Sequence, residues 1–502
     1  MQRVNLPIGT SDFAEIRREG WYYVDKTGLI GDLLNTRKAK VTLITRPRRF
    51  GKTLGMNMLA NFFDIRKDSK ALFEGLEVSK DLALCEQWRN QWPVLFVSFR
   101  RVDGLNFQSA YGMLELTITD LFREHRYLLD SEQVGDDEKK MIHRLLQGTA
   151  TEREVKNSLL LLTEMMQANY GKPVILLMDE YDVPLAKASA NGYYKEMLDV
   201  MKGIMQAMKD NSALQLAVIT GCLRIAKESI FTGTNNFVSD TITSSRLNEY
   251  FGFTQAEVDK LLEDTGLTDH AEDIKAWYDG YHFGEFDIYC PWDVINYCYD
   301  ACSSAHAQPK AYWINTSGNE MVRRLISKGT DGTTQMDIER LIAGETITKT
   351  LNENLTHNEI DANIENIWSL LYMTGYLTAV GYPNGRQYEL RIPNMEVRQI
   401  YMEQVLDWFK GRAAAQSDKL TGLYEAFESG SADAIKEYLD EQLLDTVSYY
   451  DAHESFYHGF LLALLSTCAS WNVSSNIETG KGRSDILVSR KDRKIGFVVE
   501  VK

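Results

Sequence analysis

The stretch VTLITRPRRFGKT (residues 41–53) decides the fold. Its first five residues are β-branched or apolar, which predicts a short buried strand. The following LGMNMLANFFD (residues 54–64) has apolar residues at helical spacing. A strand, a loop ending in Gly-Lys-Thr and a helix are the context that a phosphate-binding loop requires, because the loop N–H groups and the helix N-terminus point at phosphate oxygens.

The loop predicts a nucleotide site with a magnesium ion. Lys52 is expected to reach the β- and γ-phosphates, and the Thr53 hydroxyl is expected to bind Mg²⁺. The full pattern has a glycine where this chain has Arg46, so the site needs support from elsewhere in the chain. The residues predicted to contact the nucleotide here are Arg46, Arg48, Arg49, Phe50, Gly51, Lys52, Thr53 and Leu54.

A second predicted strand ends in two acidic residues. Residues 174–178 (VILLM) form an apolar run of the kind that is buried in a parallel sheet, and Asp179 and Glu180 follow directly. Asp179 is expected to hold Mg²⁺ through water, and Glu180 is expected to polarise the attacking water as a general base. The alternative interpretation is a helix N-terminus enriched in acids.

A third predicted strand, residues 214–220 (LQLAVIT), also ends in polar residues. Thr220 is expected to orient water against the γ-phosphate, and Arg224 is expected to neutralise charge in the transition state. A turn with a surface arginine is the alternative. Because ligands bind at the carboxyl ends of strands in open α/β sheets, the three strand ends together predict an ATPase or GTPase site.

Composition and charge limit the remaining possibilities. The chain of 502 residues has 44% hydrophobic and 25% charged residues, which excludes wholesale disorder. Its net charge of −16 argues against a general nucleic-acid coat, although residues 37–70 carry ten Lys/Arg and two acids. Without an 18-residue apolar run or a signal peptide, and with six scattered cysteines, we expect a cytoplasmic protein with no membrane span.

The sequence resembles the AAA-ATPase-like family of prokaryotic proteins that carry a C-terminal PD-(D/E)XK nuclease-like domain. The resemblance covers nearly the whole chain, and its motifs are YYVDKT (22–27), RPRRFGKT (46–53), LLMDEYD (176–182), TGCLRIAKESIFTGTNN (220–236), YFGFT (250–254), WYDGYHFG (277–284) and ETGKGRSDI (478–486). The family's loop has the same Arg-Pro-Arg-Arg form. The resemblance implies ATP as the nucleotide, with Walker roles for Lys52, Thr53, Asp179 and Glu180 and a sensor-type role for Arg224. Nothing in the spacing excludes GTP.

Three further features have alternative interpretations. Trp21, Tyr22 and Tyr23 precede Asp25, which suits a flap over the nucleotide base, with core packing of the aromatic rings as the alternative. The aromatic segments 277–284 and 288–292 are interpreted as packing, with a ligand cage as the alternative. Cys298, Cys302 and His306 share a helix face but lack a known zinc spacing.

After residue 254 the pattern becomes helical. A capping box at Thr254 and Glu257 starts a helix, and residues 311–327, 364–377, 396–409 and 420–444 are amphipathic. This predicts a helical lid or recognition domain behind the nucleotide domain. The predicted domains are residues 1–250 (ATPase), 251–445 (mainly helical) and 446–502 (nuclease-like).

The last residues place acidic and basic side chains on one strand face. In IGFVVEVK (residues 495–502), Glu500 and Lys502 share a face because strand side chains alternate. Asp485, on a predicted strand 485–488 that follows another at 471–476, can meet them across the hairpin. Asp485 and Glu500 are expected to bind Mg²⁺, and Lys502 is expected to activate the hydrolytic water.

The resemblance adds Glu454 as a helix-borne acid and Glu478 as an accessory acid of the nuclease-like domain. Nuclease folds of this type continue behind the strand that carries the lysine, whereas the sequence stops at Lys502. An impaired nuclease site is therefore expected.

The expected fold class is α/β: a P-loop NTPase core with an ASCE/AAA-like parallel sheet, a helical middle domain and a partial PD-(D/E)XK nuclease-like module. The expected function is ATP hydrolysis that gates engagement of nucleic acid. The alternatives are a regulatory ATP-dependent switch that binds a protein partner and cuts nothing, and a nucleic-acid-binding protein whose nuclease fold has lost its chemistry. Candidate partners are DNA, a protein, and further copies of the chain that supply an arginine such as Arg246 or a loop arginine.

Overall fold

The computed structural model describes residues 4–35, 39–224, 237–304, 306–313, 320–328, 332–381, 383–415, 417–444, 461–462, 465, 468, 470–479, 482–490 and 496–500. The chain divides into two compact units. The first comprises Met1–Pro309, Asn352–Asn366 and Met373–Gly375, and the second comprises Lys310–Leu351, Ile367–Tyr372 and Tyr376–Lys502. None of the described helices is long and apolar enough to cross a membrane.

The first unit is built on a parallel sheet of five strands in the order β2-β3-β4-β1-β5. The strands are β1 (Val41–Thr45), β2 (Val94–Ser98), β3 (Val174–Asp179), β4 (Leu214–Gly221) and β5 (Phe237–Asp240). All residues of β1 and β3 are buried, because helices cover both faces of the sheet. This confirms the predicted ASCE/AAA-like parallel core, in which β4 separates the strand before the loop from the strand that carries Asp179.

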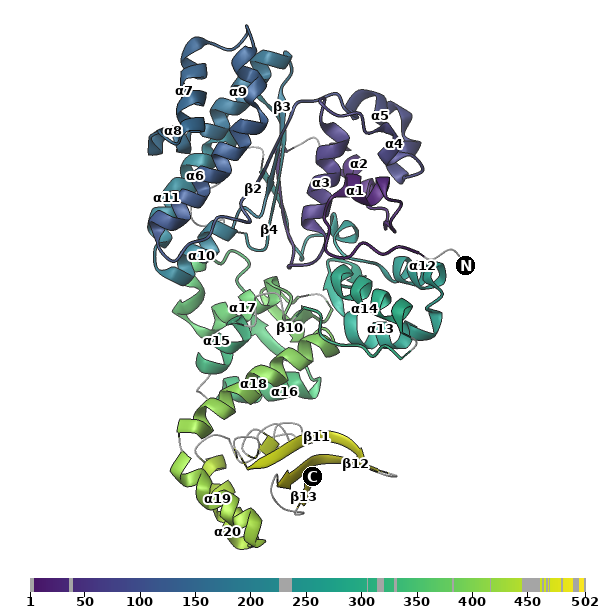
Figure 1. Cartoon of the computed structure of the whole chain (residues 1–502), viewed down its shortest axis with the longest axis vertical. Coiled ribbons are helices and arrows are strands. Elements are labelled where there is room, and N and C mark those ends of the chain that lie inside the picture. Colours follow the sequence, from purple (N-terminus) through teal and green to yellow (C-terminus); the bar gives the residue numbers. More distant parts are fainter. Residues whose placement is uncertain are drawn as a thin grey trace. The chain divides into compact units, whose positions relative to one another are not determined.

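Two helical layers enclose this sheet (Figure 1). One apolar core unites Leu176 and Met178 with the layer formed by α6 (Phe107–Glu124), α7 (Asp136–Gln147), α8 (Glu152–Lys156), α9 (Ser158–Tyr170), α10 (Val183–Asn191) and α11 (Tyr194–Ile204). The other unites Ile175 and Leu177 with α1 (Phe13–Arg18), α2 (Gly28–Asn35), α3 (Lys52–Phe63), α4 (Lys70–Phe73) and α5 (Leu82–Trp88). Successive side chains of β3 therefore point to opposite faces of the sheet and contribute to both apolar cores.

The unit continues through α12 (Gln255–Thr265), α13 (Ala271–Tyr278), a hairpin of β6 (Tyr281–Phe283) and β7 (Phe286–Ile288), and α14 (Pro291–Ser303). The predicted capping box is present, since Thr254 accepts from the Glu257 N–H and Glu257 accepts from the Thr254 N–H. Among the described residues, no group of three His, Cys, Asp or Glu side chains is placed to hold a metal ion. Cys298 of α14 is fully buried, which does not support a metal site on this helix.

The YYVDKT motif (residues 22–27) contacts segments that are distant from it in the sequence. Tyr23 packs edge-on against Phe13 with 5.2 Å between ring centroids, which supports core packing of the aromatic rings. Asp25 accepts hydrogen bonds from the Thr27 hydroxyl at 2.6 Å and the Glu77 N–H at 2.6 Å. The Asp25 carboxylate is thus committed to local turns, and we assign it this structural role in place of the predicted nucleotide contact.

Lys26, in the same motif, contacts residues more than 200 positions later. Its replacement tests how much these contacts contribute to the free energy of unfolding. Its ammonium contacts the Glu257 carboxylate at 2.6 Å and donates to the Glu249 carbonyl at 2.6 Å, with 13% of the side chain exposed. Lys26→Met is expected to cost about 3 kcal/mol of unfolding free energy, because it leaves Glu257 without its cation. Chemical denaturation measures this. Lys80→Met, which removes an exposed pair with Glu77, is the control and should change little.

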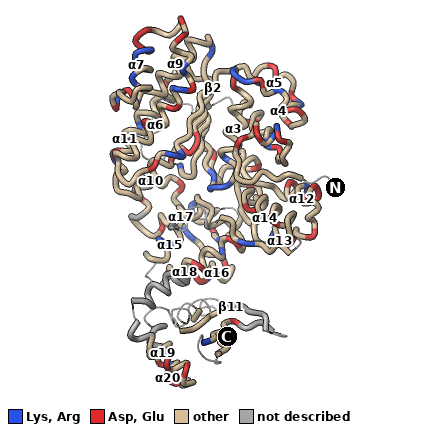
Figure 2. The backbone as a smooth tube through the Cα atoms, viewed as in Figure 1, with Lys and Arg blue, Asp and Glu red and all other residues tan. Residues whose placement is uncertain are grey.

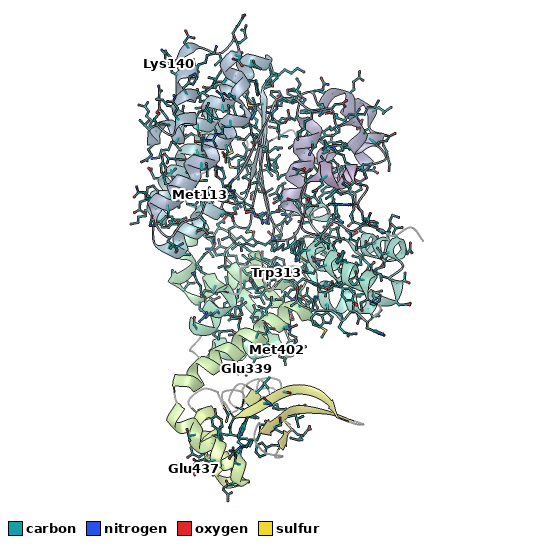
Figure 3. All side chains as sticks on the ribbon, in the orientation of Figure 1. Met113, Lys140, Trp313, Glu339, Met402 and Glu437 are labelled. Atoms are coloured by element: carbon teal, nitrogen blue, oxygen red, sulfur yellow. The ribbon has the colours of Figure 1, made fainter. Side chains whose placement is uncertain are left out.

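The second unit contains helices and a small sheet. Its helices are α15 (Glu320–Lys328), α16 (Gly332–Ala343), α18 (Met395–Ala415), α19 (Ser417–Ser429) and α20 (Ala432–Leu444), and α17 (Ile364–Met373) runs across the boundary between the units. β8 (Ile347–Thr350), β10 (Gln387–Arg391) and β9 (Thr378–Ala379) form an antiparallel sheet in that order, which the helical pattern did not predict. Trp313, labelled in Figure 3, packs on Tyr376 with ring centroids 4.8 Å apart. The predicted segment 420–444 is two helices because Gly430 turns the chain at φ 68°.

The C-terminal strands form a separate antiparallel sheet in the order β11-β12-β13. β11 (Trp471–Thr479) and β12 (Gly482–Arg490) are longer than predicted, and β13 covers Gly496–Val499. Trp471, Ile486 and Val488 are buried together with Leu465 and Cys468. Glu428 of α19 accepts from the Trp471 indole at 3.2 Å and pairs with Arg490 at 2.5 Å, so polar contacts also join this sheet to α19.

Candidate nucleotide site

The phosphate loop has two residues in the left-handed region. Arg49 has φ 73° and Gly51 has φ 83°, a conformation that glycine adopts at little cost. Gly51 is the N-cap of α3 and has no side chain with which to cap that helix. The first N–H groups of α3 are therefore available for an anion, as the sequence predicts for a phosphate loop.

Lys52 lies inside this loop. Its side chain is buried, and its ammonium donates to the carbonyls of Arg46 at 2.8 Å and Pro47 at 2.7 Å. The same Nζ lies 3.8 Å from the Cys222 sulfur. The ammonium is thereby held between the loop and the end of β4, where the strand ends meet.

Asp179 joins the three predicted strand ends. It is fully buried, and one carboxylate oxygen accepts from the Thr53 hydroxyl at 2.9 Å. The other accepts from the Thr220 hydroxyl at 2.5 Å. A buried carboxylate next to a threonine hydroxyl is a set of hard oxygen donors, so these residues fit Mg²⁺.

Glu180 stands at the turn after β3 with φ 52°, an unusual backbone conformation for a residue with a side chain. Burial raises the pKa of its carboxyl, and the neighbouring charge of Asp179 raises it further, while Lys52 and Arg100 act in the opposite direction. A raised pKa brings a carboxylate closer to the range in which a general base is effective.

The residues after Glu180 clamp the end of β4. The Tyr181 hydroxyl donates to the Leu223 carbonyl at 2.7 Å. One oxygen of Asp182 accepts from the N–H groups of Cys222 and Leu223, both at 2.9 Å. This clamp was not predicted, although Asp182 lies within the quoted LLMDEYD motif. It fixes the segment that leads to Arg224.

Gly221 is required by the same clamp. A Cβ atom there would lie 2.6 Å from Cε1 of Tyr181 and 2.7 Å from Oδ1 of Asp182. Gly221→Ala is therefore expected to lower the unfolding free energy by about 1–3 kcal/mol, measured by chemical denaturation. Gly112→Ala is the control, because open space surrounds Gly112 inside α6 and alanine favours a helix. Equal stability of the two variants would contradict the clamp.

Arg46 is fully buried behind the loop. Its guanidinium donates to the carbonyls of Thr45 at 2.8 Å and Asp240 at 2.9 Å, and to that of Arg246 at 3.3 Å. We therefore assign Arg46 the role of bracing the loop against β5, in place of the predicted contact with the nucleotide. Arg246 also faces Asp240, with 3.6 Å between the charged atoms.

Aromatic side chains far along the chain support the loop. Phe50 is buried against Tyr281 and Phe283 of the β6–β7 hairpin, at centroid distances of 4.9 and 5.1 Å. The Arg49 guanidinium lies 3.9 Å above the Trp292 ring, a cation–π contact. The WYDGYHFG motif is thus a packing element, as the sequence favours, and its specific partner is the phosphate loop.

Arg48 is classed as exposed, and its guanidinium donates a hydrogen bond to the side chain of Cys222, the residue after β4. Burial alone would lower the pKa of its guanidinium, but Cys222, Asp182 and Glu180 outweigh burial and the pKa is raised. Arg100, which follows β2 and acts on Glu180, is a second basic residue near the site. It was missed because β2 was not predicted, although VLFVS (residues 94–98) is itself a short apolar run.

Leu54 and Arg224, which are also predicted site residues, have intermediate burial. Leu54 is half-buried on α3. Arg224 is also half-buried, and within the described part of the chain its buried Nε has no hydrogen-bond partner. Lys, Arg, Asp and Glu are interspersed along the backbone of this unit (Figure 2).

In the C-terminal sheet, Ile486 pairs with Val499, so the next position places Asp485 opposite Glu500. Asp485 is half-buried and Glu500 is exposed. Both are offset by one residue from the buried Ile486 and the partly buried Val499, and therefore belong to the other face of the sheet. Glu478 of β11 pairs with Arg483 in the register. The predicted residues Glu454 and Lys502 lie outside the described residues.

Comparisons with known proteins support both modules. Residues 7–231 match the family model described as predicted AAA-ATPase, and residues 452–502 match the PD-(D/E)XK nuclease superfamily. The chain is 28% identical over 415 residues to an uncharacterized protein in the vnfD 5′ region of Azotobacter chroococcum mcd 1, an alignment that covers 81% of this chain and 70% of the relative. The first match contains the loop, Asp179, Glu180, Thr220 and Arg224. The predicted resemblance is confirmed for these two modules, whereas the motifs at residues 250–254 and 277–284 lie outside both matches.

Proposed function

We propose, from these two matched modules, that the chain binds ATP with Mg²⁺ at the carboxyl ends of β1, β3 and β4 and hydrolyses it. The observation that carries the proposal is the buried Asp179, whose two carboxylate oxygens accept from the hydroxyls of Thr53 and Thr220. Three segments that are distant in sequence thereby meet at one sheet edge, where open α/β sheets bind ligands.

Each residue has a proposed role in this reaction. Lys52, already held at the loop carbonyls, binds the phosphates, and the N–H groups at the start of α3 contribute further donors. Thr53 and Asp179 hold Mg²⁺, which supplies positive charge that offsets the charge developing on the phosphate oxygens. Glu180 takes a proton from the attacking water, Thr220 orients that water, and Arg224 stabilises the transition state.

We further propose that ATP turnover is coupled to nucleic acid through the C-terminal module, with Asp485 and Glu500 as ligands of a second Mg²⁺. The match of residues 452–502 and the opposed positions of these acids support this. The second candidate is a regulatory ATP-dependent switch that binds a protein partner, which the net charge of −16 favours. The six scattered cysteines favour a reducing compartment, and we propose a cytoplasmic location.

The test of coupling is ATP turnover with Mg²⁺ in the presence and absence of double-stranded DNA. Stimulation by DNA supports the coupled function. Turnover that is indifferent to DNA supports the protein-directed switch. No binding and no turnover of ATP would refute the proposed nucleotide site.

Cleavage has its own test at Asp485. In a C-terminally extended protein, Asp485→Ala is expected to reduce Mg²⁺-dependent DNA cleavage by at least about 100-fold, because one of two metal ligands is lost. Cleavage is followed on a labelled duplex. Glu437→Ala, at an exposed acid of α20, is the control (Figure 3). Unchanged cleavage by Asp485→Ala in that protein would remove the metal-site assignment.

A further inference from the structure

We propose that Arg48 is a catalytic arginine that the phosphate loop supplies within the same chain, and that it contacts the γ-phosphate of ATP during hydrolysis. The inference rests on the proposed ATPase function and deepens it. It assigns different tasks to the arginines of the RPRR sequence, of which the first, Arg46, is already committed to the carbonyls behind the loop.

Arg49, the third arginine of the RPRR sequence, is held by contacts with Trp292 and Cys290. Its guanidinium stacks 3.9 Å above the Trp292 ring, and its carbonyl lies 3.9 Å from the Cys290 sulfur. Moving Arg49 to a phosphate would break the stacking contact. Within the loop, Arg48 is the arginine that donates a hydrogen bond to the side chain of Cys222, the residue after β4.

The surroundings of Arg48 place it beside the proposed reaction centre. Its guanidinium donates a hydrogen bond to the Cys222 side chain, and the same sulfur lies 3.8 Å from Nζ of Lys52. The Cys222 N–H is bonded to Asp182 at 2.9 Å. Two loop cations therefore approach one sulfur at the end of β4, two residues beyond Thr220.

The charges around Arg48 support the same placement. Asp182 and Glu180 both favour its charged form, so the guanidinium lies within electrostatic reach of the proposed general base. A cation near Glu180 is well placed for the γ-phosphate, because the base and the phosphate act on the same water.

The step that Arg48 assists balances without another reactant. The water oxygen forms a bond to the γ-phosphorus, and the bond from that phosphorus to the bridging oxygen breaks with its electron pair passing to ADP. Glu180 takes the water proton and releases it to solvent, so the products are ADP, phosphate and H⁺. The guanidinium stabilises charge on the phosphate oxygens, as arginines do in related reactions.

An arginine from the same chain has a consequence for assembly. Hydrolysis needs no arginine from a neighbouring copy, so turnover per chain should stay constant over a 100-fold dilution. An arginine from a second copy would instead make turnover fall as the copies separate.

The test compares Arg48→Ala and Arg48→Lys with wild type and with Arg153→Ala, a substitution at an exposed position of α8. For Arg48→Ala we expect kcat to fall about 10²–10³-fold with KM within about threefold, and for Arg48→Lys a partial recovery. Calorimetric titration gives a second readout. Arg48→Ala should keep the affinity for ADP and lose the tighter binding of ADP with aluminium fluoride, a transition-state analogue.

The outcomes separate the two proposals. A kcat for Arg48→Ala within about threefold of wild type, or a preference for ADP with aluminium fluoride that is unchanged, would overturn the role of Arg48 while leaving the ATPase in place. Turnover per chain that falls on dilution would overturn supply within the same chain. Wild type that neither binds nor hydrolyses ATP would overturn the proposed function itself. Melting temperatures of the Arg48 variants are compared with that of wild type, because Arg48 also donates a hydrogen bond to the Cys222 side chain.

Discussion

Glu180→Gln is expected to reduce ATP turnover by about 10²–10⁴-fold while leaving ATP binding intact. Glutamine keeps the size of the side chain but cannot take the proton of the attacking water. Single-turnover kinetics and calorimetric ATP binding measure the two quantities separately. Glu132→Gln, at an exposed position, is the control. Turnover near the wild-type rate would show that Glu180 is not the base.

The direction in which ATP turnover changes with pH follows from the pKa of Glu180. Burial, followed by the charge of Asp179, raises the pKa of the Glu180 carboxyl. A base is active when it is deprotonated, so kcat/KM, which reports the protein before it binds ATP, should rise with pH through this raised pKa. The rise should therefore occur at higher pH than an exposed glutamate would give, and it should be absent from the residual activity of Glu180→Gln.

Lys52→Ala is expected to abolish nucleotide binding and with it turnover. The ammonium is the buried cation of the loop, and the carbonyls of Arg46 and Pro47 hold it in place. Its loss removes positive charge where the phosphates would bind, in a site where water screens little. Binding of a fluorescent ATP analogue measures the effect, with Lys70→Ala, at an exposed position of α4, as the control.

A folded Lys52→Ala protein that binds ATP normally would refute the nucleotide site. Melting temperatures must be compared, because the lysine also bonds to the loop carbonyls. If the variant unfolds, Lys52→Met, which keeps most of the side-chain volume, becomes the informative substitution.

The sequence predicts the elements that carry motifs. The strands β1, β3 and β4, which end at Thr45, Asp179 and Gly221, are predicted because their apolar runs end in polar residues that suit a nucleotide. β2 and β5 carry no such signature and were not predicted. The strand order also has no local signal, since it arises from contacts between segments far apart, such as Val41 pairing with both Ala217 and Phe237.

Residue roles set by distant contacts were harder to predict. Arg46 was expected at the nucleotide because it lies in the loop, whereas its burial depends on Asp240 and Arg246, about 200 positions later. Asp25 was assigned to a flap, whereas its partners include Glu77. In both cases the residue type suits a ligand equally well, and only the fold supplies the competing partner.

The anchoring of Phe50 by Tyr281 and Phe283 has a consequence for synthesis of the protein. Domains generally fold as units while the ribosome adds residues from the N-terminus. The parallel sheet is encoded by residue 240, yet the loop has its full support only after Trp292 has left the exit tunnel. A nascent chain is therefore expected to acquire its sheet before it acquires a rigid phosphate loop, and a fragment ending at residue 250 should bind ATP more weakly than the full chain.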